Sequence, residues 1–185
     1  MADHHDPSRV FHGDATRLRS SSRLARLELP RVLELCLSGL AVRSALDVGT
    51  GTGVFAEAFV AAGLTVTGVD LAPELLTIAR DIVPGAIFLE AGAEDLPCDE
   101  LAYDLVFLGH VLHEADDPLG VLREARRVAR LRVAVLEWPY RDDSQGPPLG
   151  HRLRPDAVAE LAGLAGFHEV ETLELDHMTL YRMTV

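Results

Sequence analysis

A glycine-rich turn is the first place in this 185-residue chain where residue types and spacing could do chemistry. Gly49, Gly51 and Gly53 follow an apolar run that contains Asp47, and a second apolar stretch begins at Val54. Glycines lack a Cβ, so the backbone can turn sharply and a ligand can approach it closely. A helix that starts after such a turn offers free N–H groups to an anionic ligand. The turn therefore predicts a site for a nucleotide-like molecule.

The glycine spacing separates the kinds of nucleotide site that use such a turn. A dinucleotide site needs G-x-G-x-x-G, whereas this chain has G-x-G-x-G and places Val54 where the third glycine would stand. A P-loop needs Gly-Lys followed by Ser or Thr, which is missing here. An NAD-binding domain and a P-loop NTPase are therefore both disfavoured.

An acidic residue, Asp70, ends the next apolar run, residues 64–69. In a doubly wound sheet the carboxyl ends of neighbouring parallel strands open onto one crevice. A carboxylate at that point can accept hydrogen bonds from both hydroxyls of a ribose. The alternative is a cap for the helix that Pro73 opens. With the glycine turn in place, the ribose role is the preferred interpretation.

The periodicity of apolar residues predicts the elements that must position these groups. Helices are expected at 27–40, 54–62, 73–83, 118–130 and 155–166, and strands at 43–48, 64–69, 86–89, 103–108, 132–137, 168–175 and 178–185. Alternating strands and helices predict an α/β fold with a doubly wound parallel sheet. The last two strands have no helix between them, so one of them is expected to run antiparallel. No repeat or linker divides the chain, which predicts a single domain over residues 1–185.

Four landmarks in register resemble class I methyltransferases that depend on S-adenosylmethionine (SAM), most closely the small-molecule UbiE/COQ5-like or methyltransferase-11-like type. The landmarks, which span about residues 46–130, are Asp47-x-Gly49-x-Gly51-x-Gly53, Asp70, Gly92-Ala93-Glu94-Asp95-Leu96-Pro97, and Tyr103-Asp104-Leu105-Val106 with Val111-Leu112-His113. The resemblance implies a Rossmann-like seven-stranded sheet of order 3-2-1-4-5-7-6. It also implies an enzyme that transfers the methyl group of SAM, with residues 1–40 as a helical lid.

The resemblance assigns cofactor contacts to eleven residues. These are Asp47, Gly49, Thr50, Gly51, Gly53, Asp70, Leu71, Gly92, Ala93, Glu94 and Gly109. The glycine turn would lie against the amino acid part of SAM, Asp70 would hold the ribose, and Leu71 would pack beside the adenine. The family often has Asp where this chain has Gly92. A backbone carbonyl, Glu94 or water must therefore serve the adenine amino group, or that contact is missing.

Two histidines, His110 and His113, follow the fourth predicted strand. Their i, i+3 spacing could place both rings on one helical face, but a metal site needs a third ligand, and no further His or Cys lies nearby in sequence. The resemblance gives His113 a packing role and places His110 near the methyl donor. His110 is therefore the candidate general base, with a place in the pocket wall as the alternative.

Two further segments could reach the methyl acceptor. Glu137-Trp138-Pro139-Tyr140 ends the fifth strand at the same crevice. It is not the Asn/Asp-Pro-Pro-Tyr motif of amino-group nucleic acid methyltransferases, which would follow the fourth strand. The loop with Gly146-Pro147-Pro148 is expected either to fold over the pocket or to lie on the surface.

Charge favours a small-molecule acceptor over nucleic acid. The formal net charge is -12, and phosphate backbones need Lys and Arg to neutralise them. Five arginines do crowd one stretch, and we interpret them as a solvated helix face with acidic neighbours. They are Arg123, Arg126, Arg127, Arg130 and Arg132.

The remaining composition predicts a cytoplasmic protein that does not associate with membranes. Cys36 and Cys98 are the only cysteines and indicate no disulfide framework. The first residues contain no apolar stretch of a secretory signal, and no apolar run is long enough to span a membrane. A non-catalytic protein that binds SAM or S-adenosylhomocysteine (SAH) would carry the same turn, so it stays open as the second hypothesis. The sequence does not define an oligomeric state.

Overall fold

The structure is a computed structural model that describes residues 15–185. Residues 1–14, part of the predicted lid region, lie outside the described residues. Seven strands form one sheet of order β3-β2-β1-β4-β5-β7-β6, as the motifs predicted. The strands are β1 (Ser44–Val48), β2 (Thr65–Asp70), β3 (Ile87–Glu90), β4 (Tyr103–Gly109), β5 (Ala129–Glu137), β6 (Val170–Glu174) and β7 (Thr179–Thr184).

The last two strands form the expected hairpin. β7 pairs antiparallel with both β5 and β6, whereas the pairs among β1 to β5 are all parallel. The prediction of one antiparallel strand is therefore confirmed. Parallel pairing brings the carboxyl ends of β1, β2 and β4 to one edge of the sheet, where the glycine turn and Asp70 lie.

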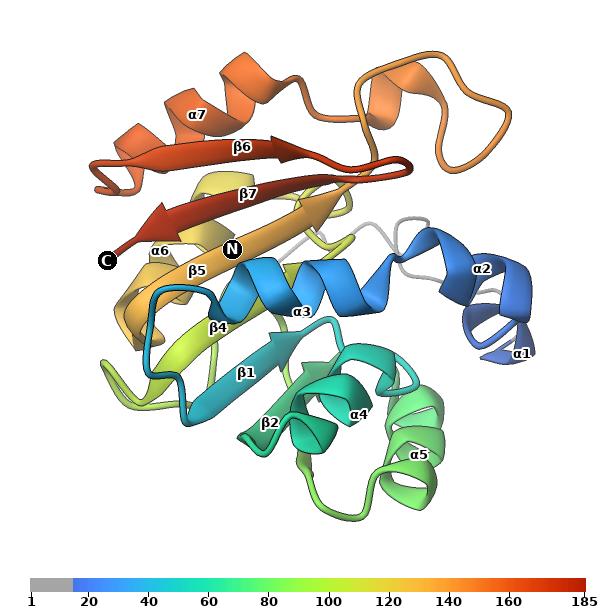
Figure 1. Ribbon diagram of the computed structural model, residues 1–185. Helices are drawn as coiled ribbons and strands as arrows, with labels where there is room; N and C mark the ends of the chain where they lie inside the picture. The colour runs from blue at the N-terminus through green and yellow to red at the C-terminus, as the bar shows by residue number, and fades with distance from the viewer. Residues whose placement is uncertain (1–14) are drawn as a thin grey trace, which may run out of the picture.

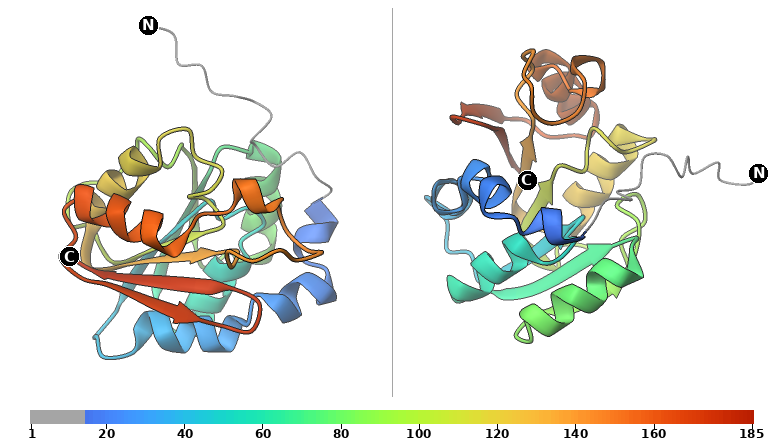
Figure 2. Two further views of the ribbon diagram at one scale, coloured as in Figure 1. Left: turned by 90° about the horizontal axis from the view of Figure 1, so that it is seen from above. Right: turned by 90° about the vertical axis from the view of Figure 1, so that its right-hand side faces the viewer.

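Helices cover both faces of this sheet. The helices are α1 (Ala15–Leu18), α2 (Ser21–Arg26), α3 (Leu29–Leu37), α4 (Val54–Ala61), α5 (Pro73–Ile82), α6 (Pro118–Val128) and α7 (Pro155–Leu164). The apolar residues of α3, α4 and α5 pack in one buried cluster, and those of α6 and α7 pack in another. The views in Figures 1 and 2 show these two groups on opposite faces of the sheet. In the part of the chain that the structure describes, no helix is long and apolar enough to cross a membrane.

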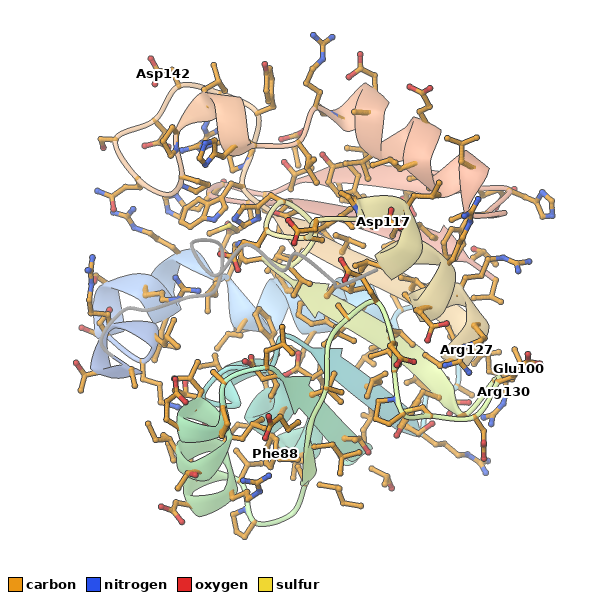
Figure 3. The ribbon with its side chains drawn as sticks, turned by 180° about the vertical axis from the view of Figure 1, so that it is seen from behind. Phe88, Glu100, Asp117, Arg127, Arg130 and Asp142 are labelled. Atoms are coloured by element: carbon orange, nitrogen blue, oxygen red, sulfur yellow. The ribbon has the colours of Figure 1, made fainter. Side chains whose placement is uncertain are left out.

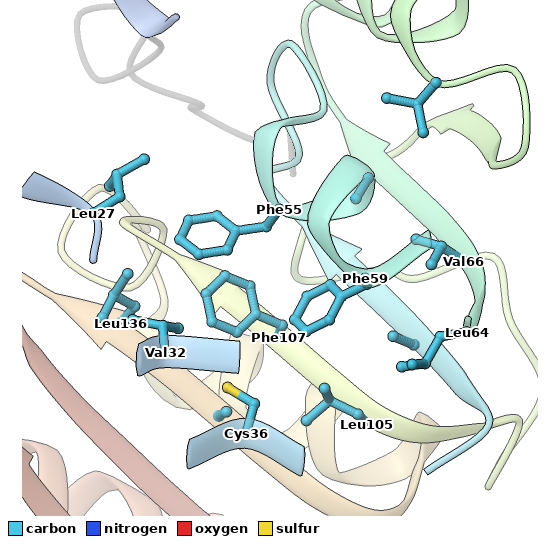
Figure 4. Packing of buried hydrophobic residues seen from close by; sticks show 14 of the residues in the cluster. Leu27, Val32, Cys36, Phe55, Phe59, Leu64, Val66, Leu105, Phe107 and Leu136 are labelled. Atoms are coloured by element: carbon cyan, nitrogen blue, oxygen red, sulfur yellow. The ribbon is translucent and has the colours of Figure 1, made fainter. Parts of the chain in front are cut away.

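Aromatic packing fixes the helix that follows the glycine turn. The ring of Phe107 in β4 lies 4.4 Å from that of Phe55 and 5.5 Å from that of Phe59, centroid to centroid. All three side chains are buried, and Figure 4 shows Phe55 and Phe59 grouped around Phe107 between α4 and the sheet. Full burial of an aromatic side chain contributes about 1.5–3 kcal/mol. The N-terminus of α4 is thus held firmly at the edge of the sheet.

The junction between α6 and β5 differs from the prediction. The helix was expected to continue to Arg130, and the strand to begin at Arg132. The helix ends instead at Val128, and Ala129 is already extended (φ -83°, ψ 139°) and pairs with Tyr103. No Gly or Pro stands at this boundary. The helix ends where the pairing of Ala129 with Tyr103 begins.

The interpretation of the arginine-rich stretch as a solvated helix face with acidic neighbours holds only in part, because Arg123 and Arg130 are exposed but other contacts bind this stretch to the fold. Arg127 donates to the carbonyls of Leu96 and Cys98 as well as to Glu124. Arg130 donates to the carbonyl of Leu101 and pairs with Asp104. Figure 3 shows Arg127 and Arg130 together where α6 meets the sheet. These side chains satisfy backbone oxygens of loops and are not presented as a basic patch.

Two arginines of the sheet hold the carboxyl end of α3. Arg132 of β5 donates to the carbonyls of Cys36 (2.7 Å) and Ser38 (3.0 Å), and Arg182 of β7 donates to that of Leu35 (2.8 Å). The last carbonyls of a helix have no partner within the helix itself. These contacts therefore stabilise α3 on the sheet through charge-assisted hydrogen bonds.

Candidate functional site

The glycine turn is built around the buried carboxylate of Asp47. Its Oδ2 accepts from the hydroxyl of Thr50 (2.7 Å) and from the backbone N–H of Ala56 (3.1 Å). Gly49, Gly51 and Gly53 all have positive φ values, of 67°, 53° and 77°. Only glycine adopts this left-handed conformation without strain. Asp47 is 1% exposed and lies beneath the turn. Its hydrogen bonds position the turn, whereas the sequence predicted that Asp47 contacts the cofactor.

Asp70 lies beside this turn, at the end of β2. Its Oδ2 accepts from the N–H of Gly51 (2.7 Å), and its Oδ1 accepts from the N–H of Ala72 (2.9 Å). The second bond is a local contact before α5, the capping alternative considered from the sequence. The first bond crosses to the glycine turn, which a cap alone would not do. Burial raises the pKa of Asp70, and hydrogen bonds from Ala72, Gly51 and Leu71 oppose that rise.

The predicted adenine side lies next to Asp70. Ala91 N–H donates to the carbonyl of Asp70 (3.1 Å), which sets the 92–94 loop beside the end of β2. Leu71 is 46% exposed, and a Cβ on Gly92 would lie 3.7 Å from its Cδ2. Leu71 and the Gly92–Ala93 segment thus flank one apolar surface. Oε1 of Glu94 accepts from the N–H of Asp117 (3.1 Å), and its predicted contact with the adenine stays a prediction.

His110 closes the other side of the turn. It lines a small cavity of ≈ 60 Å³ together with Gly49–Thr52, Gly109 and residues of the first helices. Its backbone is left-handed (φ 62°), which is uncommon for a residue with a side chain. Both of its ring nitrogens are buried without a hydrogen-bond partner. Burial, with the charges of Arg23 and His113, holds the pKa of His110 well below its ordinary value, so the ring is neutral.

His113 is committed to a structural pair. Its ring atom Nδ1 lies 2.7 Å from Oε2 of Glu137, and its backbone N–H donates to Oε1 of the same carboxylate (3.1 Å). Burial lowers the pKa of His113, but the hydrogen bond and charge of Glu137, with the charge of Glu114, raise it above its ordinary value. This pair joins the turn after β4 to the end of β5, in agreement with a packing role. Glu137 is 1% exposed, so this pair is buried.

The first helices contact the turn through residues that sequence reasoning missed. Arg19 donates to the carbonyl of Thr52 through Nε (3.2 Å) and Nη2 (2.7 Å), and its Nη1 pairs with Glu57 at 2.7 Å. Leu18 and Leu27 line the same cavity as His110. The segment thus lies over the site, as a lid would. An arginine bound to a backbone carbonyl leaves no sequence pattern, so no signal could have identified Arg19.

The 141–150 loop packs against Trp138 at Gly146, and most of its other residues are exposed. A Cβ on Gly146 would lie 2.6 Å from the ring of Trp138, so the loop touches this tryptophan directly. Arg152 is 6% exposed and donates to the carbonyls of Pro139, Arg141, Gln145 and Pro147. Its guanidinium lies 5.8 Å from the Trp138 ring centroid. Sequence reasoning missed Arg152, which holds loop and tryptophan together.

Trp138 brings the loop into contact with the candidate base. Its ring lies 5.1 Å from that of His110, centroid to centroid. Of the four residues at the end of β5, Trp138 therefore faces the site, whereas Tyr140 is 43% exposed and lies near Arg154.

Comparison with known proteins relates part of this arrangement to a family. Residues 46–133, just under half of the chain, match the family Methyltransf_11, described as a methyltransferase domain. The matched residues begin within β1 and end within β5, and they include the glycine turn, Asp70 and His110. This result confirms the resemblance to the UbiE/COQ5-like type, whose cofactor is SAM.

Curated relatives are similar to part of this chain. An uncharacterized methyltransferase of Mycobacterium tuberculosis is 36% identical over 107 residues, which cover 57% of this chain and 44% of the relative. A demethylmenaquinone methyltransferase of Chlorobaculum tepidum is 40% identical over 86 residues, or 46% of this chain and 36% of the relative. The chain thus spans less than half the length of these curated relatives.

A solved structure confirms the fold over nearly the whole length of the chain. A SAM-dependent methyltransferase from Aquifex aeolicus superposes with a TM-score of 0.81 at 23% identity, covering 94% of this chain and 99% of that one.

Asp47 makes a prediction about pH. Burial raises the pKa of Asp47 to about 7, against hydrogen bonds from Thr50 and Ala56, whereas an unfolded Asp titrates near 3.9. The folded state then holds a proton that the unfolded state releases, so Asp47 lowers stability progressively as pH rises from about 4 to about 7. Asp47→Asn retains an acceptor oxygen and lacks this titration. The melting temperature of Asp47→Asn minus that of the wild type should therefore increase by on the order of 5 °C when the pH is raised from about 4 to about 8.

The control for this measurement is Asp81→Asn, an exposed carboxylate on α5. Its melting temperature should follow the wild type at every pH. Equal pH dependence of Asp47→Asn and wild type would contradict the burial of a titrating carboxylate under the turn.

Gly51 makes a prediction about cofactor access. A valine there must adopt φ near 53°, at a cost of roughly 1–2 kcal/mol, and its Cβ would enter the space beside Leu18, 3.6 Å from Cδ1. Gly51→Val is expected to abolish SAH binding in calorimetry while most of the protein stays folded. Gly63→Val is the matched control, since Gly63 has φ 87° and open space around its Cβ position. Both variants should lose similar stability, and only Gly51→Val should lose SAH binding. Normal SAH binding by Gly51→Val would show that the cofactor does not lie against this turn.

Proposed function

We propose that this chain transfers the methyl group of SAM to a small-molecule acceptor at the carboxyl edge of the sheet. The observation that carries this proposal is a cavity lined by the glycine turn and an unpartnered His110, with Asp70 bonded to the turn at Gly51. The cofactor fits these residues, because buried polar atoms without partners are rare in proteins and here adjoin the turn. Of the four such side-chain atoms within residues 15–185, three adjoin the turn, namely both His110 nitrogens and Oγ1 of Thr52.

The predicted contacts divide among the parts of the cofactor. Gly49, Thr50, Gly51 and Gly53 would hold the amino acid part, with Gly109 on the far side. Asp70 would hold the ribose hydroxyls, and Leu71, Gly92 and Ala93 would enclose the adenine. When bound, SAM supplies a methyl group that is already activated on a sulfonium. The protein's task is then to orient the acceptor and to exclude water.

His110 is the candidate general base for an acceptor that loses a proton. Its ring is neutral, buried and without a hydrogen bond of its own, so a lone pair is free to accept that proton. Trp138 lies against the same ring and would form the wall for the acceptor. The small-molecule acceptor, the exclusion of nucleic acid and the cytoplasmic setting stay predictions from the sequence.

The test is calorimetric titration of the purified chain with SAM, SAH and NAD, followed by an assay of SAH release with a panel of small nucleophiles. Binding of SAM and SAH, no binding of NAD, and release with at least one small acceptor are expected. The comparisons give no support to a non-catalytic binder. No binding of SAM would overturn the proposal, and efficient methylation of tRNA, rRNA or DNA would overturn its small-molecule part.

A further inference from the structure

A second, larger cleft adjoins the cofactor crevice. It has a volume of ≈ 390 Å³ and lies between α1–α2, Trp138, the 145–146 part of the loop and Met178 after β6. Leu18, Arg23 and Leu27 line both this cleft and the cavity of His110, so the two spaces are neighbours. Figures 1 and 2 show α2, the 141–150 loop and the turn of the β6–β7 hairpin at the same end of the sheet.

Three arginines line this cleft, Arg17, Arg23 and Arg26, and no acidic residue is among its described lining residues. This is unusual in a chain with a formal net charge of -12. The other arginines near the site are committed to partners: Arg19 binds Thr52 and Glu57, and Arg152 binds loop carbonyls. Within residues 15–185, the side chains of Arg17, Arg23 and Arg26 form no hydrogen bond or ion pair. Glu114 attracts Arg23 electrostatically without such a contact.

The rest of the cleft is apolar. Trp138, Leu27 and Met178 contribute to its walls, and Met178 and Leu27 are themselves buried. An apolar wall beside uncompensated guanidinium groups matches a molecule with an apolar or aromatic body and an acidic head. Guanidinium groups bind carboxylates and phosphates through paired N–H donors.

The geometry points to a methyl acceptor that carries a carboxylate or phosphate, held by Arg17, Arg23 and Arg26 with its apolar body against Trp138. This inference rests on the proposed methyl transfer and names its substrate class. Trp138 also lies 5.1 Å from His110, so a molecule on this wall reaches the candidate base. The same three arginines exclude cationic acceptors by charge repulsion.

The single tryptophan of the chain, Trp138, provides the measurement. Its fluorescence is followed during titration with two pairs of probes, 4-phenylbutyrate against 4-phenylbutyramide and benzyl phosphate against benzyl alcohol. Each titration is made with the SAH-saturated protein and repeated without SAH. At least one acid should bind about tenfold more tightly than its neutral partner, and the pair with the larger ratio distinguishes carboxylate from phosphate.

Two variants and a control locate the effect. Arg17→Gln and Arg26→Gln, at residues that line this cleft but not the cavity of His110, should each weaken binding of the preferred acid by about tenfold and leave its neutral partner and SAH unchanged. Arg31→Gln removes the same charge from an exposed site where Arg31 pairs with Glu34, and it should change nothing.

Several outcomes would overturn the inference. They are equal binding of acid and neutral probes, no binding of any probe, an acid preference that survives in both variants, and a loss of SAH affinity in the variants, which would assign the arginines to the cofactor. Failure of SAH to bind the wild type would count against the proposed methyl transfer. The titrations without SAH would still decide the acid preference of the cleft.

Discussion

Replacing Asp70 by alanine is expected to weaken SAM binding by at least about a hundredfold, because hydrogen bonds to a charged group contribute about 1.5–3 kcal/mol each and two are lost. The carboxylate ends β2 beside the glycine turn and already accepts from the N–H of Gly51. Folding should suffer much less, since Asp70 is only partly buried and water can replace it at the N–H groups of Gly51 and Ala72. The measurement is the SAM dissociation constant together with the melting temperature.

Asp81→Ala is the control for this experiment, because it removes the same charge from an exposed position on α5. It should leave the SAM dissociation constant unchanged. If a folded Asp70→Ala protein bound SAM like the wild type, Asp70 would be a cap for α5 and no ribose ligand.

Replacing His110 by asparagine is expected to lower turnover by about 10²–10⁴-fold, the usual contribution of a general base. The acceptor is whichever small molecule the SAH-release panel identifies. Asparagine suits the test because it tolerates the left-handed backbone (φ 62°) better than most residues do. The SAH dissociation constant should stay nearly unchanged, since only the transition state loses the contact.

His168→Asn serves as the control, since His168 is exposed and lies in the segment between α7 and β6. It should retain full turnover. A loss of SAH affinity in His110→Asn would instead make His110 part of the cofactor pocket. Unchanged turnover would show that His110 is no base.

The sequence predicted the fold closely because its signals were local. Pro73, Pro118 and Pro155 each open a helix where expected. Glycines mark the turn after β1, and β-branched runs mark the buried strands. The start of β5 was missed by three residues, because the end of α6 depends on the pairing of Ala129 with Tyr103 and not on a helix-breaking residue.

The site was predicted in its residues but not in its connections. The turn, Asp70 and His110 could be read from spacing, and they do meet at one edge of the sheet. Arg19 and Arg152 could not, because their partners are backbone carbonyls, which every residue possesses. The sequence does not distinguish Arg23 from a surface arginine, because only the folded chain forms the cleft that Arg23 lines. Electrostatic roles of this kind depend on which charges stay unpaired after folding.

The attachment of α3 to the sheet has a consequence for motion over the crevice. Arg132 and Arg182 hold the last turn of α3, whereas α2 precedes it across Glu28, whose backbone is left-handed (φ 49°). Within residues 15–185, hydrogen bonds from Arg19 to Thr52 and Glu57 tie the short helices to the turn. Local unfolding that admits and releases ligands should then stop at Glu28. Amide hydrogens of α2 would exchange quickly and slow down when a ligand is bound, while those of α3 would stay protected in both states.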